Sequence, residues 1–182
     1  MTYYPYWYRL DSADAYLLWY TDVSPDGVDP DGVVLDEAGF ILTFRHVDDL
    51  RQEAARRGLP VEPRVDPEPL DLDAIALWLA TARKTNVDCE TFLNAWNLFS
   101  DLASTIQGGP AHIDGQREGQ IYHKLFWGNN LPVVTPPGKH YDPLWSKSDV
   151  GKMRNVLGVG MRLFRDRLGP DVASGQGWLE VR

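Results

Sequence analysis

The sequence predicts an α+β fold, with a small N-terminal antiparallel sheet, three or four packed helices and a long ordered loop rich in proline and aromatic residues. Before residue 60, apolar residues group into short runs separated by Pro and Gly turns, which is typical of strands. After residue 70, apolar residues recur at helical spacing. Residues 122–145 hold four prolines and two glycines among large aromatics, which is too apolar for a solvated linker.

Length and composition predict one domain over residues 1–182. A chain of 182 residues with 43% hydrophobic and 24% charged residues can bury a core of its own. We expect an acidic, β-rich part over about residues 1–60 and a mainly helical part over about residues 70–170.

The predicted strands lie in the first 44 residues. Residues 6–10 alternate weakly between apolar and polar positions, and the aromatic run 15–20 predicts a strand. Two Pro-Asp-Gly turns within residues 24–32 then predict an exposed acidic loop, which lacks the terminal Glu and the ligand spacing of a calcium loop. The runs 33–35 and 40–44 predict an antiparallel hairpin.

Helical spacing begins at Val47, and Gly58 offers a left-handed residue to end that first helix. Four prolines within residues 60–69 predict a connector or a short edge strand. A second helix is expected to begin at Asp71, and a third, over about 88–106, is apolar on more than one side. This third helix is predicted to be the central helix of the core.

The last predicted helix follows Trp145, where Ser146 and Asp149 form a variant of the capping box. Residues 122–145 before it are predicted to be an ordered loop, without helix, that presses onto the core. Gly158 and Gly160 are expected to let the helix pack closely against that loop. Residues 177–181 form a possible final strand.

Charge narrows the classes of partner. The net charge of −8 argues against a nucleic-acid binder, because phosphate contacts need clustered Lys and Arg. Residues 1–91 hold 18 acidic and 8 basic side chains, whereas residues 92–182 hold 8 and 10. An acidic N-terminal half would speed association with a basic protein, and it also fits a plain role in solubility.

The sequence gives little support for catalytic or metal chemistry. His46, His112, His123 and His140 show no metal-binding spacing, and no nucleophile elbow or phosphate-binding loop is present. The single cysteine, Cys89, precludes an intrachain disulfide and is interpreted as a core residue. We predict no enzyme, no metal and no cofactor. With no signal-like N-terminus and no long apolar run, the expected location is the cytoplasm, without membrane contact.

Three stretches together resemble a known class of protein. They are Leu93–Asp101 (LNAWNLFSD), Lys124–Pro132 (KLFWGNNLP) and the Tyr141-Asp142-Pro143 run, followed by Trp145 and a helix with Arg162-Leu163-Phe164. The chain resembles small bacterial immunity proteins encoded beside polymorphic or contact-dependent growth-inhibition toxins. The resemblance covers about residues 40–168, and Trp-Gly-Asn-Asn-Leu-Pro is its most specific part.

The resemblance implies a non-catalytic toxin inhibitor, which binds the cognate toxin domain of its own cell in the cytoplasm as part of a toxin–antitoxin type of system. If that toxin is a nuclease with a basic groove, acidic side chains of the N-terminal half would be the contact. The residues expected to bind the partner are Asp26, Asp29, Asp31, Asp36 and Glu37.

A second class remains open, namely a small-molecule-binding protein or enzyme with a pocket between the central helix (88–106) and the 122–145 loop. Aromatic and amide side chains at these positions could line such a pocket, although they more commonly fill cores and satisfy turns. The lining residues expected for this pocket are Trp96, Asn97, Asp101, Asn129 and Tyr141.

Overall fold

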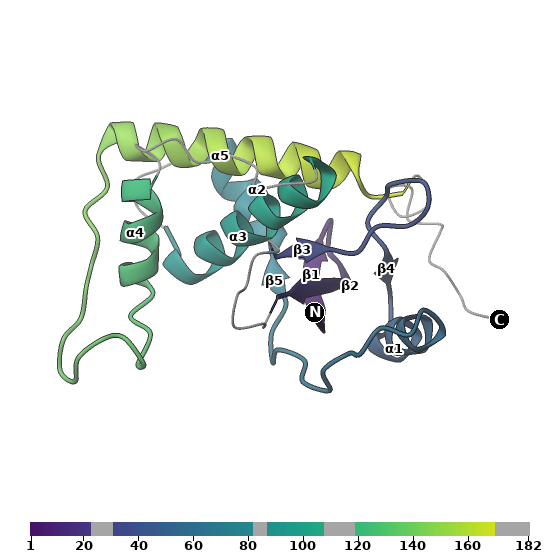
Figure 1. The fold of residues 1–182 in the computed structure, drawn as a ribbon. Coiled ribbons are helices and arrows are strands. Elements are labelled where there is room, and N and C mark those ends of the chain that lie inside the picture. Colours follow the sequence, from purple (N-terminus) through teal and green to yellow (C-terminus); the bar gives the residue numbers. More distant parts are fainter. Residues whose placement is uncertain (23–30, 82–86, 108–118, 170–182) are drawn as a thin grey trace.

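The computed structural model describes residues 1–22, 31–81, 87–107 and 119–169. It is an α+β fold in which a small mixed sheet is flanked by helices (Figure 1). The strands are β1 (Thr2–Leu10), β2 (Ala13–Thr21), β3 (Gly32–Val33), β4 (Thr43–Phe44) and β5 (Leu70–Asp71). The helices are α1 (Val47–Arg56), α2 (Leu72–Thr81), α3 (Cys89–Gln107), α4 (Gly119–Gly128) and α5 (Lys147–Asp166).

The sheet is built on one long hairpin. β1 and β2 pair over nine residues each, so the strand predicted at 15–20 and the weak alternation before it are two full partners. Asp11 and Ser12 form the turn with φ of 53° and 61°, the left-handed geometry that matches the twist of two-residue hairpins. Both turn amides donate to the Asp73 carboxylate of α2, each at 2.7 Å.

The predicted antiparallel sheet is in fact mixed. Its strand order is β3-β2-β1-β5, and β4 pairs with another part of β2. β3 and β4 run antiparallel to β2, whereas β5 runs parallel to β1 because α1 and the proline-rich connector carry the chain across before it. The antiparallel hairpin predicted for 33–35 and 40–44 is reduced to an isolated Leu35–Ile41 bridge, because β3 and β4 both pair with β2 and not with each other.

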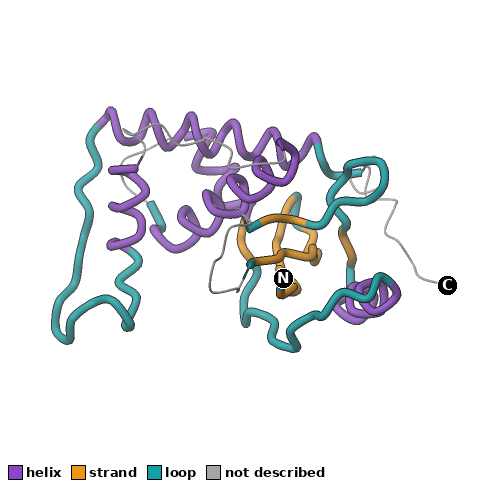
Figure 2. The backbone as a smooth tube through the Cα atoms, in the orientation of Figure 1, coloured by secondary structure: helices purple, strands orange, loops and turns teal. Residues whose placement is uncertain are grey.

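Successive side chains of a strand point to opposite faces of the sheet, so the strands contribute to two hydrophobic clusters, one on each face. Leu17 points into the main cluster with α2, α3, α4 and α5, while its neighbour Leu18 points into a smaller cluster under α1. Figure 2 shows α1 set apart from the other helices, across the strands. Two-sided burial explains why the 15–20 run is apolar throughout.

Helix ends follow the sequence signals closely. α1 is followed by Gly58 at φ 68°, and the capping box of Ser146 and Asp149 opens α5. α3 carries ten buried residues, which confirms it as the central helix. The structure contains five described helices, one more than the upper limit expected.

The additional helix is α4, and it corrects the prediction for residues 122–145. The first seven of those residues are helical rather than loop, because all four prolines lie at or beyond Pro132. Ile121 and Leu125, one helical turn apart, bury their side chains against α3. The proline-rich composition of residues 132–145 conceals the helical spacing of the residues before them.

The glycines of α5 do not pack against that loop. A Cβ on Gly160 would lie within 2.6 Å of the Phe99 side chain, so this glycine lets α5 approach α3. A Cβ on Gly158 would make only ordinary contacts, with Arg162 and Leu79. No described helix is both long and apolar enough to cross a membrane. The strand proposed for residues 177–181 lies outside the described residues.

Candidate functional site

The segment between α4 and α5, residues 129–145, is here called the arm. It contains turns but no helix or strand, and it extends at the end of the molecule opposite α1 (Figures 1 and 2). The sequence predicted that residues 122–145 close the core. The helical part and Trp145 do pack against the main cluster, but the apolar residues between them are largely exposed.

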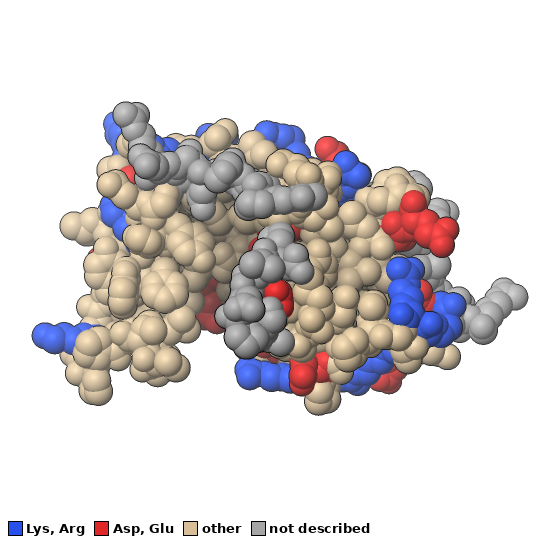
Figure 3. Space-filling view, viewed as in Figure 1, with Lys and Arg blue, Asp and Glu red and all other residues tan. Residues whose placement is uncertain are grey.

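Exposed apolar side chains concentrate in this part of the molecule. Among the described residues, nine large hydrophobic side chains are exposed, and six of them belong to the arm or to the last turn of α4. Val133 is 95% exposed, Leu144 85% and Trp127 46%. We call the six the arm face; its members are Trp127, Leu131, Val133, Val134, Tyr141 and Leu144. Most of the surface over this region is uncharged, with a few charged groups at its edges (Figure 3).

Hydrogen bonds of the Asn130 side-chain amide, here called the clasp of the arm, connect the two ends of the arm. The Asn130 side-chain amide donates to the carbonyls of Gly128 at 2.9 Å and Tyr141 at 3.0 Å. In return, the Tyr141 backbone N–H donates to Asn130 Oδ1 at 2.7 Å. Asn130 itself has a φ of 51°, which Asn tolerates better than most residues. Two of these hydrogen bonds join Asn130 to Tyr141 and so close residues 130–141 into a loop.

The base of the arm is anchored to the helices. Lys124 Nζ lies 2.8 Å from Asp149 Oδ2 and donates to the Leu144 carbonyl at 3.0 Å, which ties α4 to the start of α5. A Cβ on Gly128 would meet Cys89 Sγ and Pro143, so the end of α4 fits closely against α3. Burial raises the pKa of the Cys89 thiol to about 11, which fits a core residue and not a reactive nucleophile.

The acidic residues expected to bind a partner do not form a single described surface. Asp26 and Asp29 lie outside the described residues. Asp36 uses one carboxylate oxygen to accept the backbone N–H groups of Ala38 and Phe40, each at 2.9 Å, so it shapes its own turn. Glu37 is exposed in that turn. Asp31 precedes β3 and is half-buried.

The alternative pocket residues are also split between two places. Trp96 is 1% exposed and belongs to the core, and Asn97 accepts a hydrogen bond from the Tyr122 hydroxyl at 3.0 Å. Asn129 and Tyr141 lie at the arm. Two cavities lie beside α3, and neither is lined by all five residues. Asn97 and Asp101 do line a cavity, but it lies on the other side of α3, toward the sheet.

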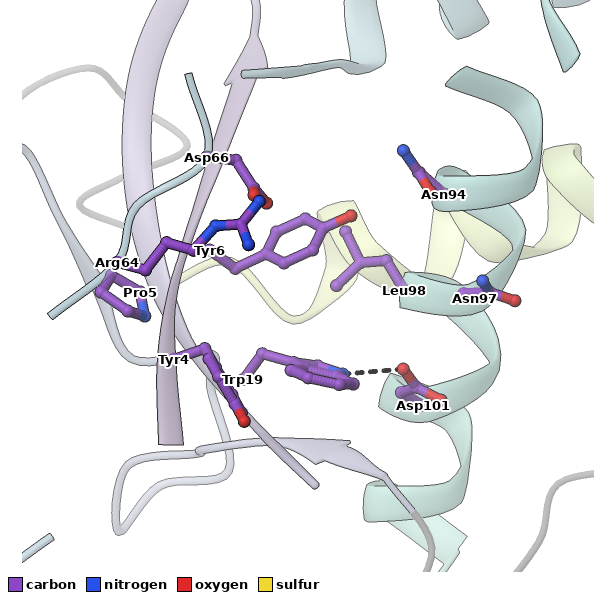
Figure 4. A pocket seen from close by; sticks show the side chains of 10 residues that line it. All are labelled: Tyr4, Pro5, Tyr6, Trp19, Arg64, Asp66, Asn94, Asn97, Leu98 and Asp101. Atoms are coloured by element: carbon purple, nitrogen blue, oxygen red, sulfur yellow. Dashed lines mark hydrogen bonds between the residues drawn. The ribbon is translucent and has the colours of Figure 1, made fainter. Parts of the chain in front are cut away.

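That cavity has a volume of about 420 Å³ and lies between β1, β2, the connector and α3 (Figure 4). Tyr4, Tyr6 and Trp19 form its strand side, and Asn94, Asn97 and Asp101 form its helix side. The helix residues recur at spacings of three and four, which places them on one face. Sequence analysis missed the strand residues, although this polar stripe on an otherwise apolar helix was visible.

Asp101 is the carboxylate of the cavity whose pKa is raised. Its Oδ2 accepts the indole N–H of Trp19 at 2.8 Å (Figure 4). Burial raises the pKa of Asp101 to about 6, and the nearby charge of Asp31 adds to the effect. Thr105 holds the helix beside it, because its hydroxyl accepts the Val33 N–H at 3.0 Å and donates to the Asp101 carbonyl at 2.9 Å.

Within the described ranges, no group of three or more His, Cys, Asp or Glu side chains is arranged to hold a metal ion. Neither a family model, nor a curated protein, nor a solved structure matches the chain. The arm and the cavity are therefore the features of the described chain that bear on its function.

Proposed function

We propose that this chain is an immunity protein, which binds and neutralises a cognate bacterial toxin domain in the cytoplasm, and that the arm face makes the principal contact. The observation that carries the proposal is the concentration of six exposed apolar side chains on one ordered segment. Exposed apolar patches of this kind mark interaction sites on soluble proteins, because leaving such side chains in water is unfavourable.

The arm face has the composition of a binding hot spot. Trp127 and Tyr141 are residue types enriched where a few side chains carry most of the binding energy. Both are partly exposed, so each has apolar surface left to bury against a partner. Val133 and Leu144 expose nearly their whole side chains. A partner that fits this surface would present an apolar groove.

The hydrogen bonds of the arm also support a role in binding. Asn130 connects the start of the arm to Tyr141, and Lys124 holds its end at Leu144. The conformation of the arm therefore exists before a partner arrives. Binding then costs less conformational entropy than the ordering of a flexible loop would. The fragment Trp127–Pro132, which contains Asn130, is also the most specific part of the resemblance to immunity proteins.

The acidic N-terminal half has a secondary role in this proposal. Its excess of carboxylates would accelerate encounter with a basic toxin without making the close contacts. Glu37 is exposed and suits such steering, whereas Asp36 is engaged in its turn. We therefore expect charge reversal at Glu37 to change the rate of association and its salt dependence more than the rate of dissociation.

Coexpression with the toxin domain encoded beside this gene tests the proposal. Wild-type protein is expected to protect cells and to copurify with the toxin domain. Replacing Val133 and Leu144 by Ser should abolish both, because it removes apolar contact while leaving the fold intact, as both side chains are 85% exposed or more.

Leu77→Ser is the matched control, because Leu77 is a large apolar side chain on α2 that is 70% exposed and lies outside the arm. It should protect and copurify like the wild type. If wild-type protein neither protected nor copurified, the immunity function would be refuted. If the double serine variant behaved like the wild type, the arm face would not be the contact.

A further inference from the structure

A second cavity of about 570 Å³ adjoins the one described above. It shares Tyr6, Arg64, Asp66 and Asn94 with the first cavity, so the two form one continuous cleft between β1, the connector and the N-terminal half of α3. Each volume is in the range of about 300–1,000 Å³ that is usual for small-molecule sites. No arm residue lines either cavity.

The cleft is strongly anionic. Its described lining contains five carboxylates and one guanidinium, that of Arg64. The carboxylates belong to Asp66, Glu68, Asp88, Glu90 and Asp101. The half-buried Asp31 adds a further negative field at Asp101. A ligand that enters this cleft meets an excess of negative charge, which favours a cation and repels an anion.

Two polar groups of the cleft have capacity for a ligand. Asp101 uses Oδ2 to accept the Trp19 indole, and no described residue donates a hydrogen bond to its Oδ1. The Tyr6 hydroxyl points across the cavity toward α3 (Figure 4) and has no hydrogen-bond partner among the described residues. Burial and the charges of Asp66 and Asp101 raise the pKa of Tyr6, so its hydroxyl stays protonated and can donate.

The strand side of the cleft supplies aromatic surface. Tyr4 and Trp19 lie with their ring centroids 5.5 Å apart, and Tyr6 lies beside them on β1 (Figure 4). An aromatic wall opposite a buried carboxylate suits a cation that carries a planar or apolar body, because ring faces attract cations while the carboxylate pairs with the charge.

From this geometry we propose that the cleft binds a small organic cation, an amine, amidine or guanidine, whose charged group pairs with Asp101 and whose body lies against Trp19 and Tyr6. Asp101 is well placed for this pairing, because Trp19 fixes one carboxylate oxygen while the other has no donor among the described residues. The cleft is a separate site from the arm face, because the two share no residue.

The indole N–H resonance of Trp19 is a direct reporter, because this group donates to Asp101. We would titrate the full-length protein with benzamidinium and benzylammonium, and with their neutral counterparts benzamide and benzyl alcohol. Both cations should shift the Trp19 resonance in a saturable way, with affinities at least about ten-fold higher than those of the neutral compounds.

Asp101→Asn should weaken binding of the cations by about ten-fold or more, because it removes the charge and keeps the acceptor for Trp19. Asp166→Asn, the same change at an exposed position on α5, is the matched control and should bind as the wild type. Tyr6→Phe should weaken binding as well. The proposal would be overturned if neither cation shifted Trp19 saturably, if the neutral compounds bound equally well, or if Asp101→Asn left the affinity unchanged.

Discussion

The β1–β2 turn and the arm are both chain reversals fixed by a polar side chain, but the turn is attached to the helices whereas the arm stays exposed. Each has a non-glycine residue at positive φ, and in each a single side chain gathers backbone groups of the chain reversal. Asp73 attaches the hairpin turn to α2, and Arg165 of α5 pairs with Asp11 at 2.7 Å. The Asn130 side chain, by contrast, hydrogen-bonds among the described residues to Gly128 and Tyr141, both at the arm itself.

The difference shows what each loop is ordered for. Asp73 and Arg165, the clasp of the hairpin, join the β1–β2 turn to α2 and α5. The order of the turn therefore serves stability. The clasp of the arm fixes a segment whose apolar side chains stay in water. Order without burial is expected where a surface is prepared for a partner, because the fold itself gains little from it.

The largest expected effect separates two tryptophans that this comparison assigns to different roles. Trp96→Ala should lower the free energy of unfolding by about 3–5 kcal/mol, because a side chain that is 1% exposed leaves a cavity. Trp127→Ala should cost about 1 kcal/mol or less, since that side chain is 46% exposed. Chemical denaturation measures both. Equal losses would show that Trp127 of the arm face is part of the core after all.

Removing each clasp sharpens the comparison further. Asp73→Ala should destabilise the protein by about 2 kcal/mol, because two turn amides lose a charged acceptor. Asn130→Ala should cost about 1 kcal/mol in the free protein and mainly weaken toxin binding, since it loosens only the arm. Thermal unfolding and a binding titration on both variants would test this, and a greater stability loss for Asn130→Ala would reverse the assignment.

A smaller effect is expected at Asp101, with a defined pH dependence. Its folded pKa is raised from 3.8 to about 6, so its contribution to stability is fully present below pH 3.8 and is lost as the pH rises through 6. Tyr6 of β1 and Asp31 before β3 act on the same site, and neither supplies a positive charge to offset the burial.

Asp101→Asn should therefore stabilise the protein at pH 7.5 by about 1–3 kcal/mol and by almost nothing at pH 3.5. Asn can still accept the Trp19 indole, so the hydrogen bond is kept in the comparison. Denaturation at the two pH values measures the difference. A variant that is less stable than the wild type at pH 7.5 would contradict the burial argument.

Much of the fold was predictable because its signals are local. Glycine at φ 68° after α1, the capping box before α5 and the apolar faces of α2 and α3 are set by neighbouring residues. The parallel pairing of β5 with β1 was not predictable, because it depends on how the connector crosses the sheet. Helix α4 was missed because the prolines after it dominated the composition of the stretch.

The candidate sites were predictable only in part. Tyr141 was identified, but as a pocket residue and not as a member of an exposed face. Asn97 and Asp101 do line a cavity, yet its aromatic wall comes from β1 and β2, far away in sequence. Aromatic residues look the same in a sequence whether they are buried or presented, and only tertiary packing distinguishes the two cases.

The central claim is that the arm is ordered for contact with a partner. Amide hydrogen exchange of the protein, free and bound to the toxin domain, tests it most directly, because exchange reports each segment separately. We predict slower exchange on binding across residues 129–145, with little change at residues 31–37. Protection that appeared at residues 31–37 and not in the arm would contradict the claim and return the contact to the acidic half of the chain.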